Sequence, residues 1–322
     1  MRLRTALPAL ALFAALAGCG PATDTRWVGA PAASAVPNAA PTRAPEPLPT
    51  RPAPAKALAV GVRQLSLSRA ADRPLPTTLW YPASGVAGGG ARSGATPAAG
   101  RFPVVILSHG LGGLPQHLAP VATRWAAAGF VVAAPAYPHT RQGAATFEIA
   151  DLLNQPADAS YVLTQVLALD TAGGDPLAEH LDTAAVAAAG HSAGGYTTTG
   201  MLAGQRDHRV RAAIVVAGGS LSGQYAGAPT PLLFIHGDAD DTVPYKDGRA
   251  AYDAAQSWPR AFLTLLGRDH ISYLAPGGAG FDKVVATTTD FLRWTLYRDA
   301  AAKGRLASDG TSAGSSRWES TL

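Results

Sequence analysis

The chain has 322 residues, a single cysteine and a formal net charge of +4 at pH 7. A charge this small, carried by scattered arginines, argues against nucleic acid binding as the main function. One cysteine excludes an internal disulfide and any cysteine-based zinc or redox site. The sequence has no P-loop, no dinucleotide-binding glycine fingerprint and no His-x-x-x-His pair, so we expect neither a cofactor nor a metal.

The amino terminus has the pattern of a signal peptide. Arg2 and Arg4 precede an apolar run, residues 6–17, which is too short to span a bilayer as a helix. The run ends in Leu-Ala-Gly before Cys19, which resembles a bacterial lipobox. The resemblance implies that residues 1–18 are removed and that Cys19 is lipidated, which would hold the protein at an extracytoplasmic membrane face of the cell envelope. An ordinary secretory signal is the alternative.

Composition divides the rest of the chain into three parts. Residues 19–57 carry nine prolines among alanine, threonine and serine, a composition typical of an extended tether that buries little apolar surface. Residues 58–300 are enough for one sizeable catalytic domain. Residues 301–322 are rich in serine and glycine, and we expect a disordered tail there.

Within the central domain, apolar strand patterns alternate with helical patterns. The alternation predicts an α/β fold with a mostly parallel central sheet of about eight strands and helices on both faces. Ligands of such sheets bind at the carboxyl ends of the strands, so the chemistry is expected there. The expected strands are 60–66, 77–81, 102–107, 131–134, 186–189, 212–216, 232–235 and 262–266, and the expected helices are 118–128, 157–169, 196–203, 245–256 and 281–297.

A glycine-rich loop after the strand at 102–107 is the first element of a candidate catalytic site. That strand runs into a glycine-rich loop, Ser108-His109-Gly110-Leu111-Gly112-Gly113. In this layout the loop contributes one backbone N–H to an oxyanion hole, and the residue after the nucleophile contributes the other. The expected donors are therefore the amides of Leu111 and Ala193.

The most informative motif is Gly190-His191-Ser192-Ala193-Gly194, directly after the expected strand 186–189. It has the layout of a nucleophile elbow, in which a serine sits on a sharp strand-to-helix turn. A side chain two residues before or after that serine would collide with the neighbouring backbone, and both positions are glycine. Ser192 is the candidate nucleophile.

Two further strands end in groups that complete a triad. Asp240 follows the strand 232–235, and His270 follows the strand 262–266. A serine hydroxyl needs a base to take its proton, which is the role expected of His270, while the carboxylate orients and stabilises the imidazole. The spacing Gly237-x-x-Asp240 favours Asp240 as the acid. Asp238 and Asp241 remain alternatives, whose other role would be to cap loop amides.

The other histidines near strand ends are expected to have structural roles. His109, His191 and His236 border strands and are interpreted as packing and hydrogen-bonding residues. His139 lies in a loop that could border the pocket.

Taken together, these motifs resemble a serine α/β-hydrolase, of the group called predicted dienelactone hydrolases or platelet-activating-factor acetylhydrolase-like esterases. The likeness covers about residues 58–298 and is carried by residues 78–83, 108–113, 154–163 and 190–196. It implies ester hydrolysis through an acyl-serine intermediate without a metal or organic cofactor. True dienelactone hydrolases use a cysteine where this chain has Ser192. Many relatives have Asp-His-Pro-Gly where this chain reads Ala-Tyr-Pro-His at 136–139.

The sequence therefore predicts a membrane-tethered carboxylic ester hydrolase that acts as a monomer on a small-molecule or lipid ester. A peptidase or amidase on the same scaffold is one alternative, although the chain has no room for the added domain such enzymes normally carry. A non-catalytic binding lipoprotein that kept the fold is the other.

Overall fold

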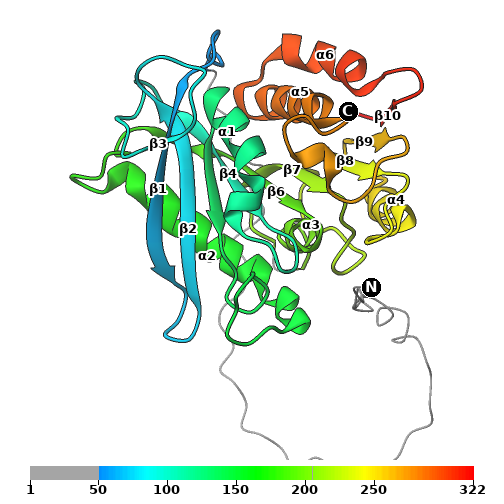
Figure 1. The fold of residues 1–322 in the computed structure, drawn as a ribbon, viewed down its shortest axis with the longest axis horizontal. Coiled ribbons are helices and arrows are strands. Elements are labelled where there is room, and N and C mark those ends of the chain that lie inside the picture. The colour runs from blue at the N-terminus through cyan, green and yellow to red at the C-terminus, as the bar shows by residue number, and fades with distance from the viewer. Residues whose placement is uncertain (1–50, 205) are drawn as a thin grey trace, which may run out of the picture. The chain divides into compact units, whose positions relative to one another are not determined.

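The computed structural model describes residues 51–204 and 206–322. Their core is a single ten-stranded sheet with the strand order β10-β9-β8-β7-β6-β4-β5-β2-β1-β3 (Figure 1). The strands are β1 (Ala59–Ser68), β2 (Pro74–Ala83), β3 (Arg92–Ser93), β4 (Phe102–Ser108), β5 (Val131–Pro135), β6 (Leu181–His191), β7 (Val210–Val216), β8 (Leu232–Gly237), β9 (Arg260–Leu265) and β10 (Ser316–Ser320).

The six consecutive strands of the sheet from β5 to β9 run parallel to one another. The sheet becomes antiparallel at β2, which pairs with β5 and β1, and at β10, which pairs with β9. Parallel strands buried on both faces need continuous apolar runs, and β4 and β5 are buried along their whole length. This geometry places the carboxyl ends of β4, β6, β8 and β9 at one edge of the sheet.

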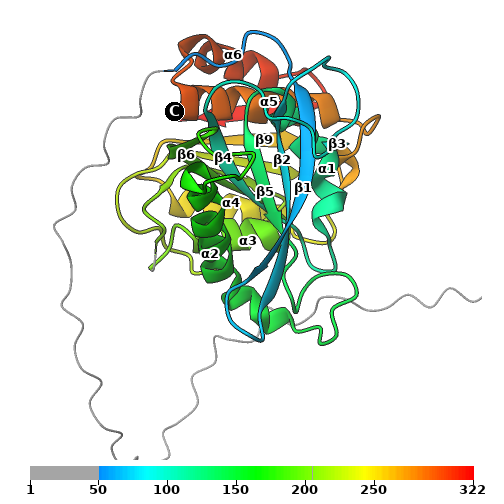
Figure 2. The ribbon, with the colours of Figure 1, turned by 90° about the vertical axis from the view of Figure 1, so that its left-hand side faces the viewer.

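Helices cover both faces of the sheet (Figure 2). The helices are α1 (Ala119–Ala127), α2 (Gln155–Ala168), α3 (Ala193–Gly200), α4 (Tyr245–Ala254), α5 (Phe281–Leu292) and α6 (Ala300–Gly310). A π-helical turn, Arg293–Tyr297, extends α5.

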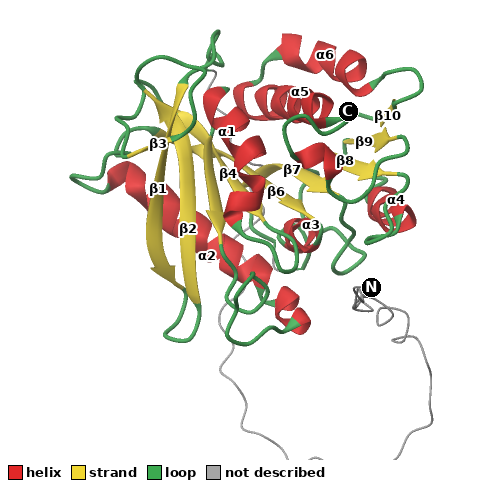
Figure 3. Cartoon of the chain, in the orientation of Figure 1, coloured by secondary structure: helices red, strands yellow, loops and turns green. Residues whose placement is uncertain are grey.

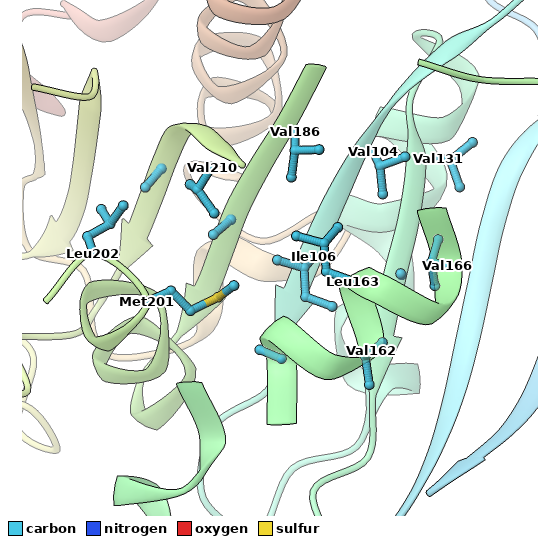
Figure 4. Packing of buried hydrophobic residues seen from close by; sticks show 14 of the residues in the cluster. Val104, Ile106, Val131, Val162, Leu163, Val166, Val186, Met201, Leu202 and Val210 are labelled. Carbon is cyan, nitrogen blue, oxygen red and sulfur yellow. The ribbon is translucent and has the colours of Figure 1, made fainter. Parts of the chain in front are cut away.

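Two apolar clusters divide the core by face. Val104 and Ile106 of β4 join the cluster that includes residues of α2 and α4 (Figure 4). Val105 and Leu107 join the cluster that includes residues of α1, α5 and α6. The alternation follows from the two-residue repeat of a strand, which turns successive side chains to opposite faces.

The expected elements are present with shifted ends. Each of the eight expected strands and five expected helices overlaps an element of the same type. The prediction of a mostly parallel α/β sheet with helices on both faces is confirmed. The sheet has ten strands instead of about eight, and the two additional strands, β3 and β10, were not expected from the sequence.

The expectation of a disordered carboxyl-terminal tail is wrong. Helix α6 packs beside α5, and β10 adds an antiparallel strand to β9 (Figure 3). Asp299 caps the first turn of α6 by accepting a hydrogen bond from the Ala302 amide at 3.0 Å. Leu306 of α6 is buried against the sheet cluster, so a few apolar contacts order a segment whose composition alone suggests disorder.

The end of the expected tether also belongs to the folded body. The Leu58 amide donates a hydrogen bond to the Ala127 carbonyl, and Arg293 donates one to the Pro54 carbonyl. The expected boundary at residue 58 is therefore too late. The predicted signal peptide, Cys19 and residues 19–50 of the tether lie outside the described residues. In the part of the chain that is described, no helix is both long and apolar enough to cross a membrane.

Candidate active site

Ser192 sits on a strained turn between β6 and α3. Its backbone has φ 58° and ψ −124°, a conformation that costs a non-glycine residue about 1–3 kcal/mol. The neighbouring strand holds the turn, because the Ser192 amide donates to the Val216 carbonyl at 2.9 Å. On the helix side, the Gly195 amide donates to the Ser192 carbonyl at 2.8 Å. The predicted elbow is thus formed at the carboxyl end of β6.

The two glycines of the motif are required by close backbone approach. A Cβ at Gly190 would lie 2.0 Å from the Gly194 carbonyl oxygen. A Cβ at Gly194 would lie 2.0 Å from the Ser108 carbonyl oxygen at the end of β4. Gly110 also approaches the elbow, since its Cβ would lie 2.9 Å from the Ser192 Cβ. Side-chain-free positions therefore let β4, β6 and α3 meet at the serine.

Asp240 is the carboxylate that contacts His270. Its Oδ2 lies 2.7 Å from His270 Nδ1. An ionised carboxylate can only accept, so Nδ1 carries the proton and Nε2 is left as the free base. The Asp238 side chain instead accepts from the Gly267 amide at 2.6 Å, which is the loop-capping role considered for it. Asp241 is exposed.

Four donors surround the Asp240 carboxylate. Oδ1 accepts from the Thr242 and Val243 amides, both at 2.9 Å. Oδ2 lies 3.1 Å from His236 Nε2, in addition to its contact with His270. Burial alone would raise the pKa of Asp240, but the hydrogen bonds from His236, His270 and Val243 outweigh it and hold that pKa far below its ordinary value. Asp240 is therefore ionised throughout the neutral range.

The sequence did not reveal His236 as a partner of Asp240. His236 is buried, and its Nε2 also lies 2.9 Å from the Val243 carbonyl. A carbonyl oxygen only accepts, so Nε2 carries the proton that is shared between Val243 and Asp240. The Cβ of any residue at 248 would lie 2.3 Å from His236 Nδ1, so Gly248 makes room for the ring. The signal available was the position of His236 at a strand end, four residues before Asp240.

His191 links the His270 loop to strand β6. Its Nε2 donates to the His270 carbonyl at 2.9 Å, and the two rings are 4.6 Å apart. Burial lowers the pKa of His191 to about 4, so the ring is neutral at pH 7. Because His191 precedes Ser192 in the chain, this bond holds the His270 loop beside the elbow. Within the described residues the Ser192 hydroxyl makes no hydrogen bond, whereas Asp240 and His270 are already paired.

The amides of Leu111 and Ala193 both lie at this edge with no acceptor. In residues 51–204 and 206–322 neither N–H donates a hydrogen bond, although the Gly112, Gly113 and Gly195 amides around them do. The loop with Leu111 is anchored by His109, which accepts from the Tyr137 amide at 3.1 Å and donates to the Gly110 carbonyl at 2.8 Å. Ala193 opens α3, where unpaired N–H groups favour negative charge. An anionic oxygen near Ser192 could use both amides.

His139 is half-buried, and its Nδ1 lies 3.3 Å from the Thr146 carbonyl. Among the described residues, no group of three His, Cys, Asp or Glu side chains is arranged to hold a metal ion.

A comparison with known protein families shows which family the chain belongs to. The model of PET hydrolase-like proteins matches residues 56–289, which include every residue of the site described above. The match does not show the narrower grouping with dienelactone hydrolases and platelet-activating-factor acetylhydrolase-like esterases that the motifs resemble, which stays a prediction. A comparison with curated proteins gives no match. The chain has the α/β-hydrolase fold and belongs to the PET hydrolase-like family of esterases.

Proposed function

We propose that the protein is a serine carboxylic ester hydrolase that works through an acyl-serine intermediate. The observation that carries the proposal is the 2.7 Å contact between Asp240 Oδ2 and His270 Nδ1, at the sheet edge that also holds the Ser192 elbow. A paired acid and base beside a strained serine is the arrangement that activates a hydroxyl nucleophile. Membership of an esterase family supports the same reaction class.

In the proposed reaction, Ser192 Oγ attacks the ester carbonyl carbon while its proton passes to His270 Nε2. The carbonyl oxygen becomes an anion, which accepts hydrogen bonds from the Leu111 and Ala193 amides. The bond from carbon to the alcohol oxygen then breaks, and His270 returns the proton to that oxygen. Water repeats the sequence on the acyl-serine, which releases the acid and restores Ser192. Asp240 stays ionised and keeps the His270 proton on Nδ1.

The substrate proposed is a carboxylic ester, with polyester chains among the candidates because the matching family is described by PET hydrolysis. The test is hydrolysis of p-nitrophenyl esters from acetate to palmitate, and of a polyester film, by the full-length protein and by Ser192→Ala. Turnover that depends on acyl length and disappears in the variant is expected. If amide analogues were cleaved in preference to esters, the peptidase alternative would replace this proposal. Two folded proteins that were equally inert would favour a binding function.

A lipid anchor on Cys19 is proposed as well, from the lipobox-like sequence before it. Several acyl chains would anchor the protein stably, since each buried methylene contributes about 0.8 kcal/mol. The test is labelling with palmitate in a bacterial host, with Cys19→Ala as the control. The wild type is expected to carry label in the membrane fraction. A wild type that is released without label would point to an ordinary secretory signal.

A further inference from the structure

Three buried polar side chains form a continuous hydrogen-bonded bridge between the two segments that carry the proposed oxyanion donors. Thr140, Gln155 and Thr197 have no solvent exposure. Gln155 Nε2 donates to Thr140 Oγ1 at 2.6 Å, and Thr197 Oγ1 donates to Gln155 Oε1 at 2.6 Å. They come from three separate segments, which are the connection after β5, the first residue of α2, and α3.

Each end of the bridge reaches the peptide unit that follows one of the two candidate oxyanion donors. Thr197 lies one turn after Ala193 in α3, and its Oγ1 is 3.1 Å from the Ala193 carbonyl oxygen. At the other end, the Thr140 carbonyl accepts from the Gly112 amide at 2.7 Å. That amide belongs to the peptide unit that joins Leu111 to Gly112. The two loops that carry the donors are thus joined through Gln155.

Packing alone does not require a polar bridge at this place. Buried hydroxyl and amide groups cost free energy unless all are paired, and an apolar trio of similar volume avoids that cost. Hydrogen bonds do what apolar contacts do not, because they fix distance and direction. The neighbouring Thr198 shows the contrast, since its hydroxyl is buried too but donates only to the Gly194 carbonyl in its own helix, at 2.9 Å.

We infer that Gln155 is a positioning residue that sets the separation of the Leu111 and Ala193 amides, and so the fit of the oxyanion hole to the transition state. The inference rests on the proposed ester hydrolysis and adds a residue to it. Gln155 touches neither the substrate nor the reacting atoms in this scheme. It acts through Thr140 on one donor and through Thr197 on the other.

The test compares Gln155→Met, Thr197→Val and the matched control Thr198→Val in the full-length protein. Loss of one oxyanion donor costs about 10²–10³ in kcat, so a misplaced donor should cost about 10- to 100-fold. Gln155→Met and Thr197→Val are expected to lower kcat by that factor and to change KM by less than about twofold, because the bridge acts on the transition state. Thr198→Val should lose a similar amount of thermal stability and keep its kcat.

A second readout uses phenylboronic acid, whose tetrahedral adduct with Ser192 places an oxygen in the same hole. Its inhibition constant should rise in the two bridge variants in parallel with the fall in kcat/KM. The double variant Gln155→Met with Thr197→Val should be no slower than Gln155→Met alone, since both changes break one bridge. If Gln155→Met does not fold, Thr140→Val breaks the same bridge with a smaller change and is judged by the same outcomes.

The inference is overturned if the bridge variants keep kcat within about twofold of wild type while losing as much stability as Thr198→Val. That result differs from a failure of the proposed function. The proposed function fails if wild type and Ser192→Ala have the same rate, and this outcome removes the inference with it.

Discussion

Replacing Asp240 with asparagine tests the proposed triad most directly. The carboxylate is met by four donors, namely the Thr242 and Val243 amides at Oδ1 and the His270 and His236 rings at Oδ2. Asparagine has one oxygen and one NH₂ group, so whichever way it turns, its NH₂ faces two of these donors. The change removes the charge and nearly preserves the shape.

The consequence for His270 follows from the hydrogen-bond directions. If the asparagine oxygen stays with the two amides, its NH₂ faces His270 Nδ1, and the imidazole then carries its proton on Nε2, where it cannot take the Ser192 proton. A wrong tautomer in a serine triad costs about 10⁴ in kcat, so we expect a loss of about 10³–10⁴. Buried donors left unpaired cost about 1–3 kcal/mol, so the free energy of unfolding should fall by a similar amount.

The assay is kcat/KM on a short p-nitrophenyl ester, with stability measured by urea unfolding of the same samples. Asp238→Asn and Asp241→Asn are the matched controls, because Asp238 contacts the Gly267 amide and Asp241 is exposed. Both should keep activity within a few-fold. The reasoning is refuted if Asp240→Asn stays within about tenfold of wild type or if either control loses as much.

Three further predictions concern the elbow, the pH dependence of stability and the carboxyl terminus. Gly194→Ala should abolish detectable ester turnover and lower the free energy of unfolding by at least about 1–3 kcal/mol, because its Cβ would lie 2.0 Å from the Ser108 carbonyl oxygen. Gly173→Ala is the control in the same assays and should behave like the wild type, because there is open space around Gly173. Burial lowers the pKa of His109 and of His191 to about 4. Between about pH 6.5 and pH 4 each ring is therefore protonated in the unfolded chain but not in the folded chain. The free energy of unfolding should fall by about 1.4 kcal/mol for each ring with every unit by which the pH is lowered through this range. Urea unfolding at pH 7, 6 and 5 measures this dependence. The free energy of unfolding should change less with pH in His191→Gln than in the wild type, and it should change as in the wild type in the exposed His208→Gln. Equal slopes in all three proteins would contradict this assignment. Deleting residues 311–322 removes β10 and uncovers β9, so the melting temperature should drop by several degrees; an unchanged melting curve would mean that the strand contributes nothing.

Much of the architecture is contained in local sequence patterns. Continuous apolar runs predicted the buried parallel strands, because a strand covered on both faces admits few polar residues. Elements at the far end of the chain were missed for the opposite reason. The segment 316–320 is polar except for Trp318, and it forms β10 by pairing with the edge of β9, which no local pattern encodes.

The site residues also differ in how far the sequence alone could identify them. Ser192 could be recognised because the elbow is a local turn whose two glycines each lie two residues from the serine. The order of Ser192, Asp240 and His270 along the chain follows the order of the strands that carry them. Which of three neighbouring carboxylates meets His270 could only be ranked from spacing. The choice depends on how the loop after β8 lies against the loop after β9, and there Asp240 faces the ring while Asp238 turns to Gly267.

The sequence by itself thus determined the fold class and the chemical groups, since periodicity and turn requirements are set by residues close together along the chain. Only the tertiary structure decided which groups touch. The second histidine on Asp240 and the bridge through Gln155 join residues from separate loops and helices. A hydrogen bond depends on angstrom-scale distances between such segments, and those distances are fixed when the whole core packs.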